Sequence, residues 1–341
     1  MKNCLFILLL IIVSCNKESA PLKIKGKPSD KFTLAFGSCN NQNIKNTMWK
    51  EIIKNNPDIF VWGGDIIYSD TYDMRLMKAN YKVQKNDSAY QDFIKRIPVF
   101  GTWDDHDYGI NDGGLEYTKK DSVQKLFLDF FDVDSLDQRR EQKGVYFSKK
   151  FKIDTTYINL IVLDTRYFRS SLTKDSTGLK RYIPNNYGNG TMLGEIQWKW
   201  LENELNNSNA SFNIIVSSVQ FLSFEHGFES WGNMPQEVDK MKDLISNSKA
   251  KGVIILSGDR HIAEISKDTI PQVEYPLIDI TASGLTHSYS SFSGEENKYR
   301  IGDVAFDKNF GILKIDLKNN SVDMEIRGEN NELYETYTQK Y

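Results

Sequence analysis

Short, nearly continuous apolar runs recur along the chain and are separated by more polar stretches. Solid apolar runs of this kind are typical of β-strands that are covered on both faces. The runs that predict strands are residues 32–36, 59–62, 97–100, 158–163, 213–216, 253–256 and 277–281. Near the C-terminus, residues 312–317 and 322–326 flank the turn Lys318-Asn319-Asn320, and this pattern predicts an antiparallel hairpin.

Helical patterns fall between several of these runs. Apolar side chains recur at helical spacing in residues 47–55, 194–205 and 235–246, and Pro235 suits a first helical turn. No linker rich in proline, glycine or serine interrupts residues 31–341, and no repeat is visible. The pattern therefore predicts one α/β layered domain with mixed β-sheets.

Composition and charge narrow the class of partner. The 43 basic and 46 acidic side chains leave a net charge of −3, which provides no field suited to nucleic acid or an anionic membrane. Hydrophobic residues make up 40% and charged residues 26%, as in ordinary globular proteins. We expect no nucleic-acid contact and infer no protein partner from these values.

The extreme N-terminus differs from the rest of the chain. Lys2 precedes an apolar run of nine residues, 5–13, which is too short for a membrane span of roughly 20 residues but suits a signal peptide. The run ends in Ile12-Val13-Ser14-Cys15, which resembles a bacterial lipobox, although a plain secretory signal is an alternative. We therefore expect a lipoprotein signal peptide in residues 1–14 and a polar tether in residues 15–30. The protein would then be exported to the bacterial envelope, periplasmic or surface, and held to a membrane by lipidated Cys15.

After such processing, Cys39 would be the one unmodified thiol of the chain. Thiols outside the cytosol tend to oxidise, so a single free cysteine in an exported protein needs a reason. Cys39 is therefore either buried and inert, or a ligand or nucleophile.

Polar clusters follow six of the predicted strands, and they are rich in aspartate, histidine, cysteine and tyrosine. Sites in open α/β sheets form beyond the carboxyl ends of strands, so these clusters predict one metal or acid/base site. Three aspartates around His106 would repel one another unless a cation neutralises them, whereas Asp65 alone could merely cap a turn. The clusters are residues 37–40, 63–70, 102–108, 164–166, 217–220 and 257–261.

The ordered motifs resemble the PhoD-like (alkaline phosphatase D) family of metallophosphoesterases. The resemblance extends over about residues 31–317 and rests on eight collinear motifs. It implies a four-layer αββα sandwich with mixed sheets, and two or more cations held close together. The motifs are GSC at 37–39, GDxIYxD at 64–70, WDDHD at 103–107, DxR at 164–166, LGxxQWxWL at 193–201, SSVQ at 217–220, SGDRHxAE at 257–264 and TASGLTHS at 281–288.

The resemblance also implies which residues hold the metals. Asp65 would bridge two cations, and the further ligands would be Cys39, Tyr68, Asp105, Asn111, Asp259 and His261. A thiolate and a phenolate suit Fe³⁺ at one position, and oxygen ligands suit a harder cation such as Ca²⁺ at the other. Zn²⁺ or Mn²⁺ are the alternatives.

Phosphate ester hydrolysis fits these residues. Water attacks phosphorus in line, and two metals can stabilise the charge on the phosphoryl oxygens. His106 could protonate the leaving alkoxide. Arg260, and as a second candidate Arg166, could bind a phosphate oxygen.

We therefore expect a metal-dependent phosphatase that hydrolyses phosphate mono- or diesters. A phospholipase-D-like phosphodiesterase acting on lipid headgroups is the first alternative. An inert surface-lipoprotein binding module is the second, and it would predict missing ligands, whereas every expected ligand type is present in the sequence.

Overall fold

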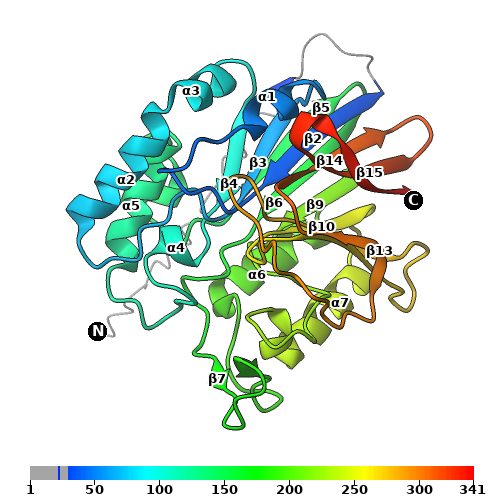
Figure 1. Cartoon of the computed structure of the whole chain (residues 1–341). Coiled ribbons are helices and arrows are strands. Elements are labelled where there is room, and N and C mark those ends of the chain that lie inside the picture. Colours follow the sequence, from blue (N-terminus) through cyan, green and yellow to red (C-terminus); the bar gives the residue numbers. More distant parts are fainter. Residues whose placement is uncertain (1–21, 24–29) are drawn as a thin grey trace, which may run out of the picture.

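Two β-sheets lie face to face at the centre of the molecule, and helices cover the outer face of each (Figure 1). The computed structural model describes residues 22–23 and 30–341. Both sheets mix parallel and antiparallel neighbours. The expected four-layer αββα sandwich with mixed sheets is confirmed.

The smaller sheet has six strands. Three of them, β2, β3 and β4, are parallel neighbours, so their carboxyl ends lie at one edge of the sheet. The other three extend the sheet by antiparallel pairing. The order is β16 (Leu333–Lys340), β15 (Ser321–Gly328), β14 (Asn309–Asp316), β2 (Lys31–Gly37), β3 (Ile59–Gly63) and β4 (Val99–Thr102).

The larger sheet has eight strands, and its four central strands are parallel. Antiparallel pairs flank this parallel centre on both sides. The order is β1 (Leu22–Lys23), β5 (Phe147–Ile153), β6 (Thr156–Val162), β9 (Phe212–Val216), β10 (Val253–Ser257), β12 (Leu277–Ala282), β11 (Ala263–Asp268) and β13 (Arg300–Ala305). A separate two-stranded hairpin, β7 (Thr173–Lys174) with β8 (Tyr182–Ile183), projects at the bottom of Figure 1.

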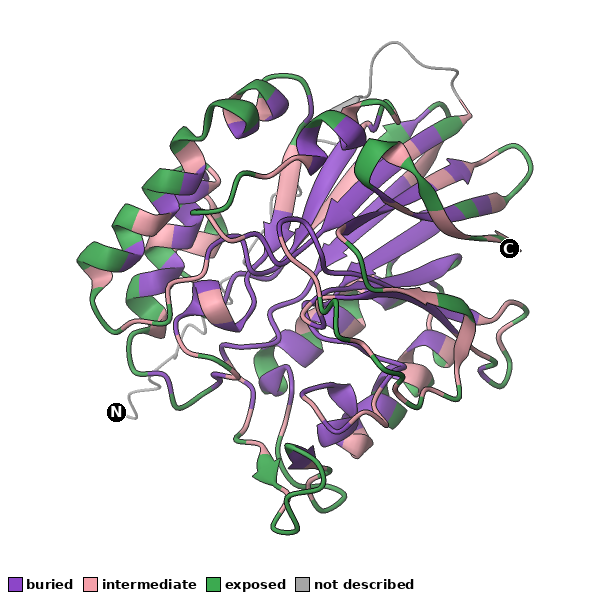
Figure 2. Ribbon diagram, viewed as in Figure 1, coloured by how far each residue is buried: buried purple, intermediate pink, exposed green. Residues whose placement is uncertain are grey.

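Side chains alternate between the two faces of each strand, so the buried apolar side chains form three layers. One layer lies between the sheets, and one lies between each sheet and its helices. Phe32, Leu34 and Phe36 of β2 point between the sheets, whereas Ala35 faces the helices. Figure 2 shows the central strands buried and the helices exposed on their outer sides. The helices over the smaller sheet are α1 (Met48–Ile53), α2 (Met74–Asn86), α3 (Ser88–Ile94) and α5 (Lys120–Phe130), and those over the larger sheet are α6 (Gly194–Asn206) and α7 (Pro235–Asn247). Four short helices complete the described part: α4 (Asp105–Tyr108), η1 (Gln138–Arg140), η2 (Trp231–Asn233) and η3 (Glu329–Asn331).

The predicted helices, strands and C-terminal hairpin occur where the hydrophobic pattern placed them, with bounds that differ by up to three residues. The strand expected at residues 97–100 begins at Val99. Proline has no backbone N–H to give to a ladder, and Pro98 serves only as an acceptor, for the N–H of Phe60.

The predicted signal peptide and lipobox fall in residues 1–21, outside the described residues, so export and the lipid anchor at Cys15 stay predictions. In residues 22–23 and 30–341, no helix is long and apolar enough to cross a membrane.

Two glycines let the sheets approach each other at one point. A Cβ atom built on Gly63, the last residue of β3, would lie 3.9 Å from the Cα of Gly258, which follows β10. A Cβ atom on Gly258 would lie 2.5 Å from Ser38 Oγ and 2.7 Å from the carbonyl oxygen of Gly63, both closer than van der Waals contact. The close approach therefore requires glycine at 258 and brings together the ends of strands from both sheets.

We predict that Gly258→Ala destabilises the protein by about 1–3 kcal/mol, because backbone atoms of β3 cannot move away from the added methyl group as a flexible side chain could. The matched control is Gly63→Ala, whose Cβ would meet its nearest atom, Ser38 Cβ, at an ordinary 3.6 Å. Urea unfolding of chelator-treated protein measures both changes. Equal stability of the two variants would show that the sheets are not in close contact at Gly258.

Candidate metal centre

The loops that follow β2, β3, β4 and β10 meet in one buried site. Cys39, Asp65 and Asp105 are each at most 3% exposed. The first three loops lie together because β2, β3 and β4 are parallel neighbours, and the loop after β10 joins them across the contact at Gly258. The structure thus brings together residues from both sheets.

The backbone of this site is unusual. Cys39, Asp65, Asp259 and His261 have φ values of 60°, 51°, 68° and 56°. Residues other than glycine adopt this left-handed conformation at a cost, and such residues concentrate at functional sites. The surrounding packing therefore holds four predicted ligand residues in conformations that the chain alone would disfavour.

Asp65 lies between a thiol and a phenol. Cys39 Sγ is 3.5 Å from Asp65 Oδ2, and Tyr68 Oη donates to the same oxygen at 3.2 Å. Burial and the charge of Asp65 raise the pKa of both Cys39 and Tyr68 well above their usual values. The three side chains can therefore reach one cation.

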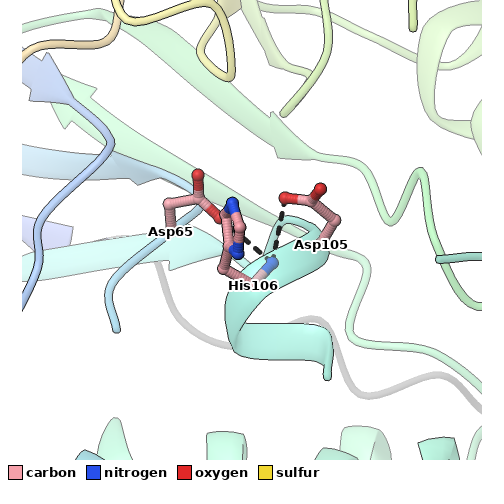
Figure 3. Close-up of side chains that lie close together, drawn as sticks. All are labelled: Asp65, Asp105 and His106. Atoms are coloured by element: carbon pink, nitrogen blue, oxygen red, sulfur yellow. Dashed lines mark hydrogen bonds between the residues drawn. The ribbon is translucent and has the colours of Figure 1, made fainter. Parts of the chain in front are cut away.

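The helix α4 places Asp105 and His106 next to Asp65 (Figure 3). The backbone N–H of His106 donates to Asp65 Oδ1 at 3.3 Å and to Asp105 Oδ1 at 2.9 Å. The imidazole of His106 packs against the ring of Tyr68 at a tilt of 31°, with centroids 4.2 Å apart, and its Nδ1 lies 2.6 Å from Asp70 Oδ2. Burial lowers the pKa of His106, but Asp65, Asp70 and Asp105 together raise it to about 11.

Asp107 has a structural role within the acidic run. Its carboxylate accepts the backbone N–H of Ile66 at 3.0 Å and that of Asp104 at 2.6 Å. It therefore ties the loop after β3 to the start of α4, and so fixes the position of Asp65 relative to Asp105.

Carboxylates crowd around Asp105. It takes part in three groups whose possible ligand atoms all lie within 4.8 Å of one another: Asp65 with Asp105 and His106, Asp104 with Asp105 and Asp259, and Asp105 with Asp112 and Glu229. Burial and the charge of Asp105 raise the pKa of Asp65 well above its usual range, and that of Asp259 to about 7. Bound cations would relieve this repulsion, so the donor set fits a metal centre.

His261 supplies independent support for a metal. Its Nδ1 is buried and has no hydrogen-bond partner in the part of the chain that the structure describes. Burial and the neighbouring His287 lower the pKa of His261 to about 4, which favours neutral imidazole. An unpaired nitrogen of neutral imidazole is a common metal ligand.

Arg166 pairs with two carboxylates of the acidic cluster. It is fully buried, with Nε 2.7 Å from Asp104 Oδ1 and Nη1 2.5 Å from Glu229 Oε2. A buried charge of this kind must be paired, because an unpaired buried ion costs several kcal/mol (about 3–5 when a partner is removed). Its guanidinium therefore positions Asp104 and Glu229, and its buried fork is not open to a phosphate oxygen as the sequence suggested.

Arg260 is also occupied by a carboxylate. Its Nη2 lies 2.8 Å and 2.9 Å from the two oxygens of Glu295, and its guanidinium lies over the ring of Phe228 at 4.1 Å. A phosphate oxygen would therefore compete with Glu295 for this arginine.

The remaining predicted ligand, Asn111, is exposed, and its neighbour Asp112 lies in the acidic cluster instead. Sequence reasoning did not assign Asp104, Asp112 or Glu229 as site residues. Asp104 belongs to the acidic run and Asp112 follows Asn111, so both could have been found. Glu229 lies in none of the eight motifs.

Comparison with known proteins agrees with this geometry. The family model described as PhoD-like phosphatase matches residues 34–326. Alkaline phosphatase D of Bacillus subtilis (strain 168) is 24% identical over 289 residues, which is 72% of this chain and 48% of the relative, so the chain spans about half of that protein's length. A solved structure described as "Structure of PhoD" has the same fold, with a TM-score of 0.72 and 17% identity over 94% of this chain and 71% of that chain. On the family match over residues 34–326, together with these likenesses, the chain belongs to the PhoD-like phosphatase family.

Proposed function

We propose that the protein is a metal-dependent hydrolase of phosphate esters. The observation that carries the proposal is that the buried Asp105 carboxylate belongs to three groups of close possible metal ligands where both sheets meet, each with two buried members and one half-buried member. Such crowding is costly without cations and is the arrangement that a centre with several metals needs. Membership of the PhoD-like phosphatase family supports the same reaction class.

The candidate ligands divide into two sets, one on each side of the proposed metal centre. Cys39, Asp65, Tyr68 and His261 would hold one cation, and Asp105, Asp259, Asp112 and Glu229 would hold the other side of the centre. When bound, the cations would stabilise charge on the phosphoryl oxygens and lower the pKa of the attacking water.

His106 is placed to assist the leaving group. Its side chain is 18% exposed, unlike the buried carboxylates behind it, and Asp70 fixes the ring through Nδ1. The other ring nitrogen is then left to give a proton to the alkoxide that departs from phosphorus.

We predict that Asp65→Asn loses both metal and activity. Asp65 contacts the ligands of one side and lies in a group with Asp105, so its loss weakens both sides and should lower hydrolysis of p-nitrophenyl phosphate by at least about a hundredfold. The matched control is Asp73→Asn, an exposed helix cap at which asparagine also serves. Metal analysis and initial rates on metal-loaded protein measure both effects.

Full metal content and full activity in Asp65→Asn would contradict the assignment of the site. An inactive wild type that nevertheless holds its metals would contradict the proposed reaction. Parallel assays with bis-p-nitrophenyl phosphate decide whether monoesters or diesters are the better substrates.

We predict that His106→Asn slows alkyl phosphates more than aryl phosphates. General acid catalysis contributes about 10²–10⁴ when the leaving oxygen is basic, whereas p-nitrophenolate departs with little help. The ratio of kcat/KM for the two substrates, measured in wild type and variant, isolates this effect. Equal losses on both substrates would instead make His106 a positioning residue.

We also propose Fe³⁺ on the side formed by Cys39 and Tyr68, and Ca²⁺ among the carboxylates. A thiolate disfavours Mg²⁺ and Ca²⁺, and a phenolate favours an electron-poor trivalent ion, whereas carboxylate oxygens suit Ca²⁺. Both side chains lie against the same oxygen of Asp65, so they can share one ion.

We predict that the metal-loaded protein absorbs visible light by charge transfer and that Cys39→Ser and Tyr68→Phe each shift or remove the band. The control is Tyr117→Phe, since Tyr117 is buried and donates to the carbonyl oxygen of Thr71 rather than to a predicted ligand. Zinc has a filled d shell and gives no such band. A colourless protein with stoichiometric zinc, or a band that survives both substitutions, would rule out this assignment.

A further inference from the structure

Four arginines lie at the acidic cluster, and they differ in what occupies their guanidinium groups. Arg166 is fully buried between two carboxylates, and Arg169 is 1% exposed and pairs with Glu229. Arg260 is 8% exposed and pairs with Glu295. Arg181 is 48% exposed and contacts Asp112 through Nη2 at 2.5 Å. Of the four, Arg181 is by far the most exposed, so its remaining N–H groups are open to solvent.

The β7–β8 hairpin holds Arg181 in place at the edge of the site. The backbone N–H of Tyr182 donates to the carbonyl oxygen of Gly227 at 2.9 Å, and Lys180 Nζ donates to that of Glu225 at 2.7 Å. The phenol of Tyr182 donates to Asp112 Oδ2 at 2.7 Å. Contacts on both sides of Arg181 in the sequence thus fix its backbone next to Asp112.

Asp112 connects Arg181 to the centre of the cluster. Its backbone N–H donates to Asp105 Oδ2 at 2.6 Å, and its carboxylate lies in one group with those of Asp105 and Glu229. The side-chain exposure rises from 1% at Glu229 through 11% at Asp112 to 48% at Arg181. Arg181 therefore lies on the solvent side of Asp112 and Glu229, where it is open to a bound substrate.

From this placement we propose that Arg181 is a specificity-determining residue that binds a second anionic group of the substrate, next to the phosphoryl group that is hydrolysed. The inference rests on the proposed phosphate ester hydrolysis. A guanidinium fork matches the oxygens of a phosphate, and a charge-assisted pair of this kind is stronger than a neutral hydrogen bond. The preferred substrates are therefore phosphate esters that carry a second phosphate, such as nucleoside diphosphates, in which the bond that is hydrolysed is the phosphoanhydride between the two phosphates.

A bound diphosphate would extend from the acidic cluster towards Arg181. Its terminal phosphoryl group would lie over the carboxylate-held cations, and its inner phosphate, which departs with the leaving group, would lie against Arg181. The P–O bond to the terminal phosphorus breaks, water supplies the new oxygen, and the inner phosphate leaves with the rest of the molecule.

The experiment compares adenosine 5′-diphosphate with adenosine 5′-monophosphate in metal-loaded wild type and Arg181→Gln. We expect the ratio of kcat/KM, diphosphate over monophosphate, to fall by about tenfold to a hundredfold in the variant. The ratio is the readout because Asp112 also loses its ion pair, which affects both substrates. Arg181→Lys should recover part of the ratio, since it keeps the charge but not the fork.

The matched control is Lys174→Gln, which removes an equal charge from an exposed position on the same hairpin. Its ratio should stay within twofold of wild type, or the effect belongs to the general charge of the hairpin. Calorimetric binding of methylenediphosphonate and methylphosphonate provides a second readout that needs no turnover, and only the former should weaken in Arg181→Gln.

An unchanged ratio with unchanged binding of methylenediphosphonate would overturn the inference and leave the proposed hydrolysis intact. Equal loss on both nucleotides would do the same, because it would make Arg181 a support for Asp112 alone. Absence of hydrolysis of either nucleotide and of p-nitrophenyl phosphate by wild type would overturn the proposed function, and calorimetry would still decide whether Arg181 binds the second anion.

Discussion

The repulsion among buried carboxylates is the constraint on which this structure depends. Asp65, Asp104 and Asp105 are buried and Asp259 is half-buried, and the buried Arg166, which pairs with Asp104, offsets only part of their charge. Placing ions in a medium of low dielectric costs far more than hydrogen bonds alone return. Backbone N–H groups and Arg166 neutralise part of the cluster, and the proposed cations would neutralise the rest. The same repulsion would favour the binding of cations, so the residues that cost stability are the ones that the proposed function uses.

The two sheets contribute unequal parts to this centre, and the glycine contact between them sets its geometry. The smaller sheet supplies Cys39, Asp65 and Asp105 from adjacent parallel strands, and the larger sheet supplies Asp259 and His261. Left-handed backbone at four of these five positions turns the side chains inward immediately after each strand. Conformational strain at the site is therefore offset by the packing of the sandwich, as expected where a rigid scaffold holds reactive groups.

The sequence predicted the central strands well because both of their faces are buried, so each appears as an unbroken apolar run. It did not reveal α2, whose buried side chains, Met77, Tyr81 and Gln84, form a narrow stripe in a polar helix. It identified Cys39, Asp65, Tyr68, Asp105, Asp259 and His261, which the structure brings to one site. It could not show that Arg166 pairs with Glu229, 63 residues away, because that pairing depends on packing between loops. For the same reason the sequence did not indicate that Arg181 lies at the site, since its pairing with Asp112 also depends on packing between loops.

The most direct test of this account is an anomalous-scattering map of crystals grown with the metal-loaded protein. We predict separate peaks among the carboxylates, one bounded by Cys39, Asp65 and Tyr68 and another beside Asp105 and Asp259, with iron identified at the first from data on both sides of its absorption edge. Fully occupied metal at other positions, with no peak near Asp65 or Asp105, would contradict the claim that cations balance the buried acidic cluster.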